Sequence, residues 1–243
     1  MARVDGFENE IWGELEVDLS AGESSSSQSG GGGSSGGGGG GSIAPSVPNK
    51  PAGPTEVDKD SVRFNDVTED YWAYAYINKL GEKEIICGDE NNNFNPDNSI
   101  SRAEFVKMLE KALGLHSDKK AEFSDVKEES WYYNSVSAVA ASGLIYGYEN
   151  NTFRPDNAIT REEIALILER AVSLKGISCN QSGEIGFSDK DCISDYAENA
   201  VEVMISLGLI SGFPDNTFKP KSYATRAETS AVICRLIDLL HNC

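Results

Sequence analysis

The sequence predicts a mainly all-α protein made of three helix-loop-helix repeats, whose second helices pack against one another as a central bundle. Three observations support this fold class: a set of motifs recurs three times in the same order, a Ser/Thr-x-x-Glu pattern marks a helix start in each copy, and an apolar stripe with helical spacing follows each start. The three shorter helices and the loops are expected outside the bundle.

Each copy of the repeat opens with Phe-x-Asp, at Phe64, Phe123 and Phe187, and continues through Ile-x-Gly and Phe-x-Pro to a closing Ser/Thr-Arg-x-Glu motif. Because self-similarity of this length indicates a repeat architecture, the order of motifs divides the chain. The predicted repeats cover residues 61–119, 120–178 and 179–243.

The second helix of each copy is predicted to begin with a capping box, in which the cap side chain and the glutamate three residues later each bond the other's backbone N–H. The three boxes pair Ser101 with Glu104, Thr160 with Glu163, and Thr225 with Glu228. The apolar stripes that follow include Phe105, Val106, Leu109, Ile164, Ile167, Leu168, Ile233, Leu236 and Ile237. Stripes of this kind must be buried, which favours a bundle.

The first helix of the second copy, predicted over residues 131–142, ends at Gly143, which suits a left-handed helix terminus. Gly208 takes the same place in the third copy, whereas the first copy has Glu84, so we expect that helix end to be closed differently. The glycines of the Ile-x-Gly motif are expected to serve a backbone turn. They are Gly88, Gly147 and Gly212.

Before the repeats, alternation of apolar and acidic residues up to Leu19 predicts one strand, interpreted as the C-terminal remnant of a β-rich domain over residues 1–23. Residues 24–60 are rich in Ser, Gly and Pro and are predicted to form a flexible linker. An N-terminal cargo domain is therefore expected to be missing from this chain. The acidic N-terminus is not typical of a signal peptide, so the protein is either cytosolic or a piece of a longer exported one.

The composition excludes several functions. With 39 acidic and 21 basic residues the net charge is -18, which argues against a nucleic-acid partner. No apolar run is long enough to predict a membrane span, and no catalytic fingerprint occurs, so we expect neither an enzyme nor a cofactor.

No metal site is predicted either. Asp89, Asn91 and Asn93 have the spacing of a calcium loop, but Phe94 stands where the loop needs glycine. The five cysteines lack a CxxC motif, which argues against zinc and against a disulfide framework. A bond between Cys179 and Cys192 remains an alternative in an oxidising compartment.

Arginine follows the cap in all three copies, at Arg102, Arg161 and Arg226. A cation is mildly unfavourable at the first position of a helix, by about 0.3 to 1 kcal/mol, so its recurrence suggests a use. A guanidinium beside free helix N–H groups would receive a carboxylate or phosphate. Alternatively, each arginine pairs with an acid of a neighbouring repeat and holds the bundle together.

Two tryptophans, Trp72 and Trp131, occur at the same place in the first two copies. Each could stack on a sugar face or fill the gap between helices, and packing in the core is the more common role. The third copy has Tyr196 nearby instead.

The motif order Phe-x-Asp-Val, Trp, Gly-Leu-Ile-x-Gly and Asn-Thr-Phe-x-Pro-Asp-Asn-x-Ile-Thr-Arg-x-Glu closely resembles the S-layer homology (SLH) module, in three tandem copies over residues 61–240. The resemblance implies a pseudo-threefold, spindle-like helical domain. It also implies an extracellular module, in the cell wall or S-layer of a bacterium, that anchors surface proteins non-covalently to secondary cell-wall polysaccharide on peptidoglycan, often through a pyruvylated amino sugar. By the resemblance, Arg102, Arg161 and Arg226 contact the glycan in grooves between repeats.

Some residues depart from the family pattern. The second copy has Glu162 where the family has alanine, and the third copy has Lys221 in place of aspartate and lacks the tryptophan. We therefore expect at least one groove, the third above all, to be weakened. A structural module that assembles with itself in a surface lattice, without binding glycan, is the alternative function.

Overall fold

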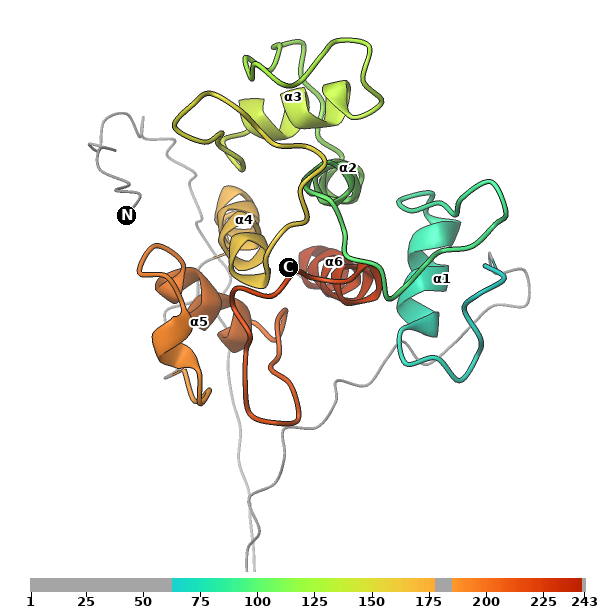
Figure 1. Cartoon of the computed structure of the whole chain (residues 1–243), viewed down its shortest axis with the longest axis vertical. Coiled ribbons are helices and arrows are strands. Elements are labelled where there is room, and N and C mark those ends of the chain that lie inside the picture. The colour runs from blue at the N-terminus through green and yellow to red at the C-terminus, as the bar shows by residue number, and fades with distance from the viewer. Residues whose placement is uncertain (1–62, 178–184, 242–243) are drawn as a thin grey trace, which may run out of the picture. The chain divides into compact units, whose positions relative to one another are not determined.

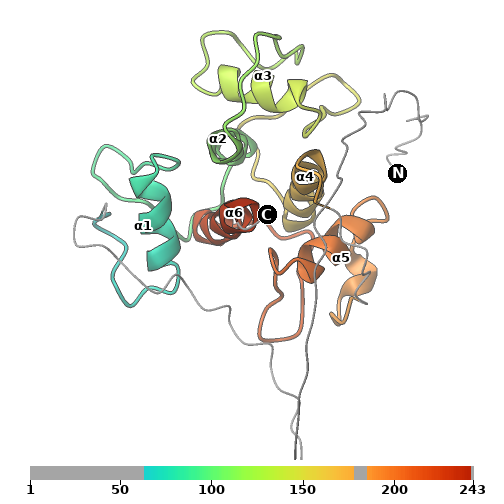
Figure 2. The same ribbon diagram turned by 180° about the vertical axis from the view of Figure 1, so that it is seen from behind.

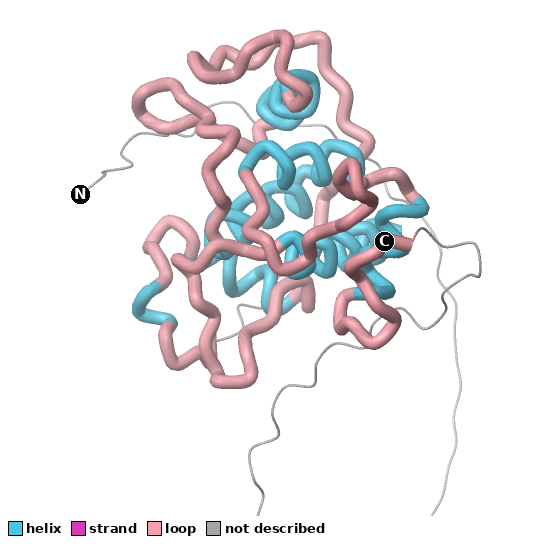
Figure 3. Tube along the Cα trace, turned by 45° about the vertical axis from the view of Figure 1, so that its right-hand side comes forward, coloured by secondary structure: helices cyan, strands magenta, loops and turns pink. Residues whose placement is uncertain are grey.

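A computed structural model describes residues 63–177 and 185–241, and over these residues the regular elements are helical, joined by long loops (Figure 3). The predicted β-rich remnant over residues 1–23 and the linker over residues 24–60 lie outside the described residues. The helices are α1 (Tyr74–Glu82), α2 (Arg102–Leu113), α3 (Tyr133–Ala141), α4 (Arg161–Leu174), a short 3-10 helix η1 (Lys190–Cys192), α5 (Glu198–Ser206) and α6 (Arg226–His241). The predicted mainly α-helical class is confirmed.

The three second helices, α2, α4 and α6, lie in the middle of the fold, and the shorter helices α1, α3 and α5 lie around them (Figure 1). The view from behind shows the same arrangement (Figure 2). Each outer helix packs on a central helix from another repeat: α1 on α6, α3 on α2, and α5 on α4. Neighbouring repeats are therefore joined by helix packing as well as by the chain.

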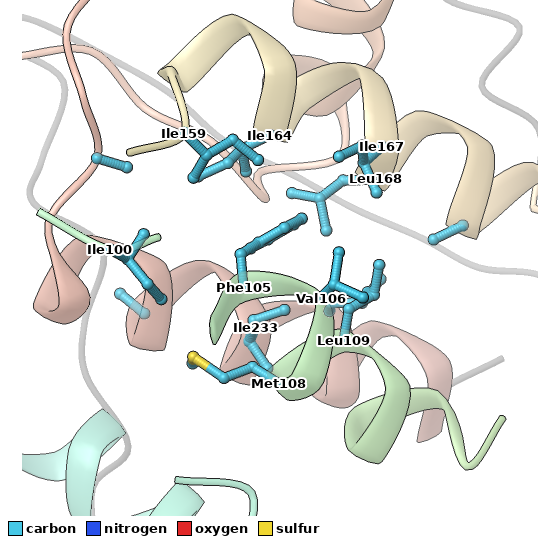
Figure 4. Packing of buried hydrophobic residues seen from close by; sticks show 14 of the residues in the cluster. Ile100, Phe105, Val106, Met108, Leu109, Ile159, Ile164, Ile167, Leu168 and Ile233 are labelled. Carbon is cyan, nitrogen blue, oxygen red and sulfur yellow. The ribbon is translucent and has the colours of Figure 1, made fainter. Parts of the chain in front are cut away.

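Apolar side chains from the central helices meet in one core (Figure 4). Phe105 and Leu109 of α2, Leu168 of α4 and Ile233 of α6 are all fully buried. Burial of each such side chain contributes about 1.5 to 3 kcal/mol. The stripes predicted from the sequence thus face one another, which is why the bundle forms.

The three segments that precede the central helices form a closed ring of backbone hydrogen bonds. The N–H of Ile100 donates to the carbonyl oxygen of Ala224 (3.0 Å), that of Ala224 to Ile159 (3.1 Å), and that of Ile159 to Ile100 (3.1 Å). All three residues are buried, so these bonds satisfy groups that water cannot reach. The ring joins the first repeat directly to the third.

All three predicted capping boxes are formed. In α4 the Glu163 N–H donates to Thr160 Oγ1 (3.4 Å), and the Thr160 N–H donates to Glu163 Oε2 (2.8 Å). The equivalent reciprocal bonds occur at the starts of α2 and α6. These bonds fix the direction in which each central helix leaves the ring.

The end of α1 corrects one expectation. Glu84 has a φ of 56°, close to the 71° of Gly143 and the 68° of Gly208, so the first helix ends in the same left-handed conformation as the other two. The Ile85 N–H donates to Leu80 O at 2.9 Å, and the matching bonds follow the two glycines. The hydrogen bonds of the turn impose the conformation on glutamate, although glycine would adopt it at lower cost.

The glycines of the Ile-x-Gly motif also differ from expectation, because none of the three has a positive φ. They are needed for close approach. A Cβ on Gly212 would lie 2.2 Å from the ring of Phe187 and 2.8 Å from the carbonyl oxygen of Thr217. Corresponding phenylalanine rings approach Gly88 and Gly147, so each glycine makes room for the phenylalanine of the Phe-x-Asp motif in its own repeat.

The aspartate of each Phe-x-Asp motif holds the loop before a central helix, a role the sequence analysis missed. The carboxylate of Asp125 accepts the N–H groups of Phe153 and Arg154, both at 2.7 Å. Arg154 has a φ of 58°, a conformation unusual for a residue with a side chain. Asp66 and Asp189 make the same pair of bonds. The recurrence of this aspartate in all three copies was the available signal.

Candidate ligand-binding site between the repeats

The three arginines that follow the caps reach across to another repeat. The Nε–H of Arg102 donates to the carbonyl oxygen of Phe153 (2.9 Å), and that of Arg161 donates to Phe218 (2.8 Å). Arg226 closes the pattern by donating to Phe94 O at 2.8 Å. Each arginine therefore hydrogen-bonds the loop before the central helix of another repeat.

Each guanidinium also pairs with a capping-box glutamate from another repeat. Nη1 of Arg102 lies 3.0 Å from Glu163 Oε1, and Nη1 of Arg161 lies 3.1 Å from Glu228 Oε1. Arg226 pairs with Glu104. We call these three pairs the arginine ring. The second oxygen of each glutamate accepts the cap N–H, so the helix starts and the ion pairs form one connected network.

The helix starts do not offer free N–H groups, which corrects the proposed anion receptor. In α2 the Arg102 N–H donates to Asn157 O and the Ala103 N–H to Pro155 O, while the Glu104 N–H donates to the cap hydroxyl. The N–H groups at the same positions of α4 and α6 also donate to acceptors of the protein. A ligand would therefore have to use the side chains and not the helix N–H groups.

The arginines differ in how much of the guanidinium side chain remains exposed: 6% for Arg102, 11% for Arg161 and 18% for Arg226. Burial lowers the pKa of Arg161, although Glu228 opposes this effect. Arginine nevertheless stays charged in proteins. The expected pairing with acids of other repeats is thus present in all three copies, with different access for a ligand.

A pocket of 490 Å³ adjoins Arg161, and residues from all three repeats line it. Trp72 and Asp97 come from the first repeat, and Phe213 comes from the loop after α5. The guanidinium carbon of Arg161 lies 4.6 Å from the centre of the Phe213 ring. We call this site the Arg161 pocket. Its volume is in the range of pockets that hold a small ligand, about 300 to 1,000 Å³.

A tyrosine and an aspartate form one side of the Arg161 pocket. The hydroxyl of Tyr71 donates to Asp97 Oδ1 at 2.7 Å. Burial, together with this hydrogen bond, raises the pKa of Tyr71 to about 12. The hydroxyl therefore remains protonated at neutral pH, and Asp97 is held in place as an acceptor.

The tryptophans lie at the surface, contrary to the expectation of core packing. Trp72 is 40% exposed and Trp131 is 56% exposed, while the neighbouring Tyr132 is buried, with its ring at 82° to that of Trp131. Lys107 Nζ lies 4.9 Å from the centre of the Trp131 ring. Both tryptophans precede the N-cap of an outer helix, and Tyr196 does so in the third repeat with 48% exposure.

The calcium-like loop and the cysteines have local roles. Asp89 Oδ1 accepts the N–H groups of Asn91 and Asn93, both at 2.9 Å, so this carboxylate caps its own loop. Cys192 is a free thiol, and Cys179 lies outside the described residues. Among residues 63–177 and 185–241, no cluster of three metal-binding side chains occurs, and no helix is long and apolar enough to cross a membrane.

A family model described as the S-layer homology domain matches residues 63–106, 122–165 and 186–230. The chain belongs to the S-layer homology family. The three matched segments agree with the three tandem SLH copies expected from the motifs. Each segment runs from a Phe-x-Asp motif into the start of a central helix, so it includes one arginine of the ring and a loop that the arginine of another repeat contacts.

Curated relatives carry similar SLH sequences within much longer proteins. Exoglucanase XynX of Acetivibrio thermocellus is 39% identical over 191 residues, which is 78% of this chain and 17% of that protein. The Surface-layer 125 kDa protein of Lysinibacillus sphaericus is 32% identical over 69% of this chain and 14% of its own length. The Cellulosome-anchoring protein of Acetivibrio thermocellus is 31% identical over 60% of this chain and 33% of its own length. The chain thus matches a third or less of each of these relatives' lengths, and the names of the second and third agree with the expected location at the bacterial cell surface.

Proposed function

We propose that the three SLH repeats form a non-catalytic anchoring module that holds a cargo domain on the bacterial cell surface by binding secondary cell-wall polysaccharide on peptidoglycan. The observation that carries the proposal is the Arg161 pocket, in which an arginine, an exposed tryptophan and hydrogen-bonding groups converge from three repeats. Proteins of the family that this chain resembles bind such polysaccharides, often through a pyruvylated amino sugar.

Arg161 can contact an acidic sugar without leaving the arginine ring. Three of its N–H groups donate to Phe218 O, Glu228 and Ser211 O, and a guanidinium has five. The remaining two can donate to a carboxylate such as that of a ketal-linked pyruvate. A charged hydrogen bond of this kind contributes about 1.5 to 3 kcal/mol to binding.

The exposed tryptophans suit the apolar face of a sugar ring. Trp72 lines the Arg161 pocket, and Trp131 occupies the same position in the next repeat, on the side of α2 that holds Lys107. A flat aromatic surface that is already exposed needs no rearrangement to stack on a saccharide. We therefore assign Trp72 and Trp131, with Arg161 and Arg226, to glycan binding.

Binding through more than one site would strengthen attachment. Arg226 occupies the same place as Arg161, with Trp131 and Asp156 in the positions of Trp72 and Asp97, and we call this region the Arg226 interface. Because a polymer presents many copies of its sugar, two sites on one folded module raise avidity without new contacts.

A sedimentation assay with purified cell walls tests the proposal. The full chain should sediment with intact walls and remain in solution with walls stripped of secondary polysaccharide. Trp72→Ala should raise the apparent Kd for intact walls about tenfold, which corresponds to the loss of about 1.4 kcal/mol of binding free energy. Tyr223→Ala, which removes an exposed aromatic outside the pocket, is the matched control and should bind like the wild type.

Two outcomes would contradict the proposal. Equal sedimentation with stripped and intact walls would show that the polysaccharide is not the ligand. Concentration-dependent self-association without glycan, combined with unchanged wall binding of Trp72→Ala, would instead support the alternative of a self-assembling lattice module.

A further inference from the structure

The place at Arg102 that is equivalent to the Arg161 pocket is flanked by different side chains. Arg102 pairs with Glu163 of α4, and α5 packs on α4, so the residues before α5 flank this arginine's helix partner. We call the region formed by Arg102, Tyr196 and Lys221 the Arg102 interface. Tyr196 and Lys221 stand at the repeat positions of Trp72 and Asp97.

A buried carboxylate contacts both flanking residues of this interface. Glu162 is 2% exposed and occupies the position that is alanine in the other repeats, at Ala103 and Ala227. Its Oε1 accepts from the Tyr196 hydroxyl at 2.8 Å and lies 2.6 Å from Lys221 Nζ. A charge buried this deeply requires such partners, because an unpaired carboxylate would be strongly destabilising.

Ser194, two residues before Tyr196, is the fourth member of the cluster formed by Glu162, Tyr196 and Lys221. The Ser194 N–H donates to Glu162 Oε2 and its hydroxyl donates to Oε1, both at 3.1 Å, and Lys221 also contacts the Ser194 hydroxyl. Burial would raise the pKa of Glu162, but Lys221, the Ser194 N–H and Tyr196 together hold it below its usual value. The carboxylate is therefore charged at neutral pH and fully partnered.

The arginine of this interface is also the most enclosed of the three. The guanidinium carbon of Arg102 lies 5.0 Å from the centre of the Tyr148 ring, and the Tyr148 hydroxyl donates to Glu163 Oε1 at 3.0 Å. In the Arg161 pocket the corresponding ring is Phe213, which has no hydroxyl and leaves Glu228 without this partner. The Arg102 interface thus differs from the Arg161 pocket at the arginine as well as at the flanking residues.

We propose that Glu162, Tyr196, Ser194 and Lys221 form an internal substitute for ligand that closes the Arg102 interface, leaving this chain with two glycan sites instead of three. The inference rests on the proposed function and extends it by assigning the number of sites. Three departures from the repeat pattern, Glu162, Tyr196 and Lys221, then share one explanation. The carboxylate replaces the acidic group of a ligand, and the lysine and tyrosine replace the groups that would contact it.

Isothermal titration calorimetry of the full chain tests the inference, with a monovalent synthetic glycoside of a pyruvylated amino sugar as the probe. The wild type should bind two molecules per chain. The variant Glu162→Ala/Lys221→Asp/Tyr196→Trp, which restores the residues of the Arg161 pocket, should bind three. The control Glu128→Ala/Lys120→Asp makes the same charge changes in an exposed ion pair and should keep two sites.

The reciprocal variant provides a second measurement that does not depend on the stability of the first. Ala103→Glu/Asp156→Lys/Trp131→Tyr introduces the closing residues at the Arg226 interface and should reduce the number of sites from two to one. Thermal unfolding followed by circular dichroism identifies which variants are folded.

The outcomes separate the inference from the proposed function. Three sites in the wild type, or two sites in a folded restored variant, would overturn the inference while leaving glycan anchoring intact. Absence of binding by the wild type to both the glycoside and intact cell walls would overturn the proposed function, and the inference with it.

Discussion

The arginine ring and the residues that flank it follow different rules. In the ring, each arginine contacts the equivalent phenylalanine carbonyl and the equivalent capping-box glutamate of another repeat. The distances from Nε to the carbonyl oxygen are 2.8 to 2.9 Å. The flanking positions instead vary from Trp72 and Trp131 to Tyr196, and from Asp97 and Asp156 to Lys221. Interactions that close the fold are thus held constant, whereas side chains at the surface are free to differ in binding.

The largest effect is expected where the ring is most deeply buried. Arg102→Met should lower the free energy of unfolding by about 3 to 5 kcal/mol, because Glu163 would lose its buried cationic partner. Urea denaturation measures the change. Arg226→Met is the matched comparison and should cost less, since that ion pair is more exposed. Equal losses for the two variants would mean that burial does not set the strength of the ring.

A smaller loss should follow from filling the space that the ring's loops require. Gly212→Ala should destabilise the protein by about 1 to 3 kcal/mol, because the new Cβ would overlap the Phe187 ring at 2.2 Å. Gly88→Ala should cost less, since its nearest contact would be 3.0 Å from Phe64. Thermal melting of the two variants ranks the effects, and the reverse order would contradict close approach as the reason for glycine.

The cluster of Glu162, Ser194, Tyr196 and Lys221 makes stability depend on pH through a carboxylate that is alanine at the same position of the other two repeats. Since the pKa of Glu162 is lower in the folded protein than its ordinary value of 4.5, its stabilising contribution is present above that value and is lost as the pH falls through the folded pKa. Stability of the wild type should therefore decrease more than that of Glu162→Gln between pH 5 and about pH 3. Parallel curves for the two proteins would show that the cluster does not bind the ionised carboxylate preferentially.

Much of this architecture could be predicted from local pattern. Capping boxes and apolar stripes depend on residues three to seven positions apart, and the α2, α4 and α6 starts and their core contacts are as expected. The partners of Arg102, Arg161 and Arg226 could not be predicted from the sequence. They lie in other repeats, and which residues meet depends on how the three repeats pack together.

The errors have a common physical cause. Glycine at position 212 and exposed tryptophan at position 131 were interpreted from average residue preferences, whereas their roles depend on neighbours distant in sequence. For Glu84, tertiary context overrides intrinsic preference in the same way: the chain needs the turn at the end of α1, and glutamate is strained to make it.

That strain predicts a gain in stability. Glu84→Gly should stabilise the protein by up to about 1 kcal/mol, because glycine adopts a positive φ without a steric cost. Glycine also gives the unfolded chain more conformational entropy than glutamate does, and this opposes the gain. Gly143→Ala, at the same position in the second repeat, is the reciprocal variant and should destabilise the fold in chemical denaturation. A more stable Gly143→Ala would contradict the assigned turn.

The smallest effect on folding is expected at a flanking residue. Trp131→Ala should change the free energy of unfolding by no more than about 0.5 kcal/mol, since the side chain is 56% exposed. The same variant should sediment less with cell walls. Loss of stability on the scale of Arg102→Met would instead assign Trp131 to the fold.

The closed circuit of hydrogen bonds among Ile100, Ile159 and Ala224 has a consequence for biosynthesis. Ala224 is synthesised 124 residues after Ile100, yet it supplies the acceptor for the Ile100 N–H, so the first repeat cannot acquire all of its native contacts while the third is still being made or exported. An open solenoid can add units one by one as they emerge. The ring of this module, by contrast, closes only after its last segment is present.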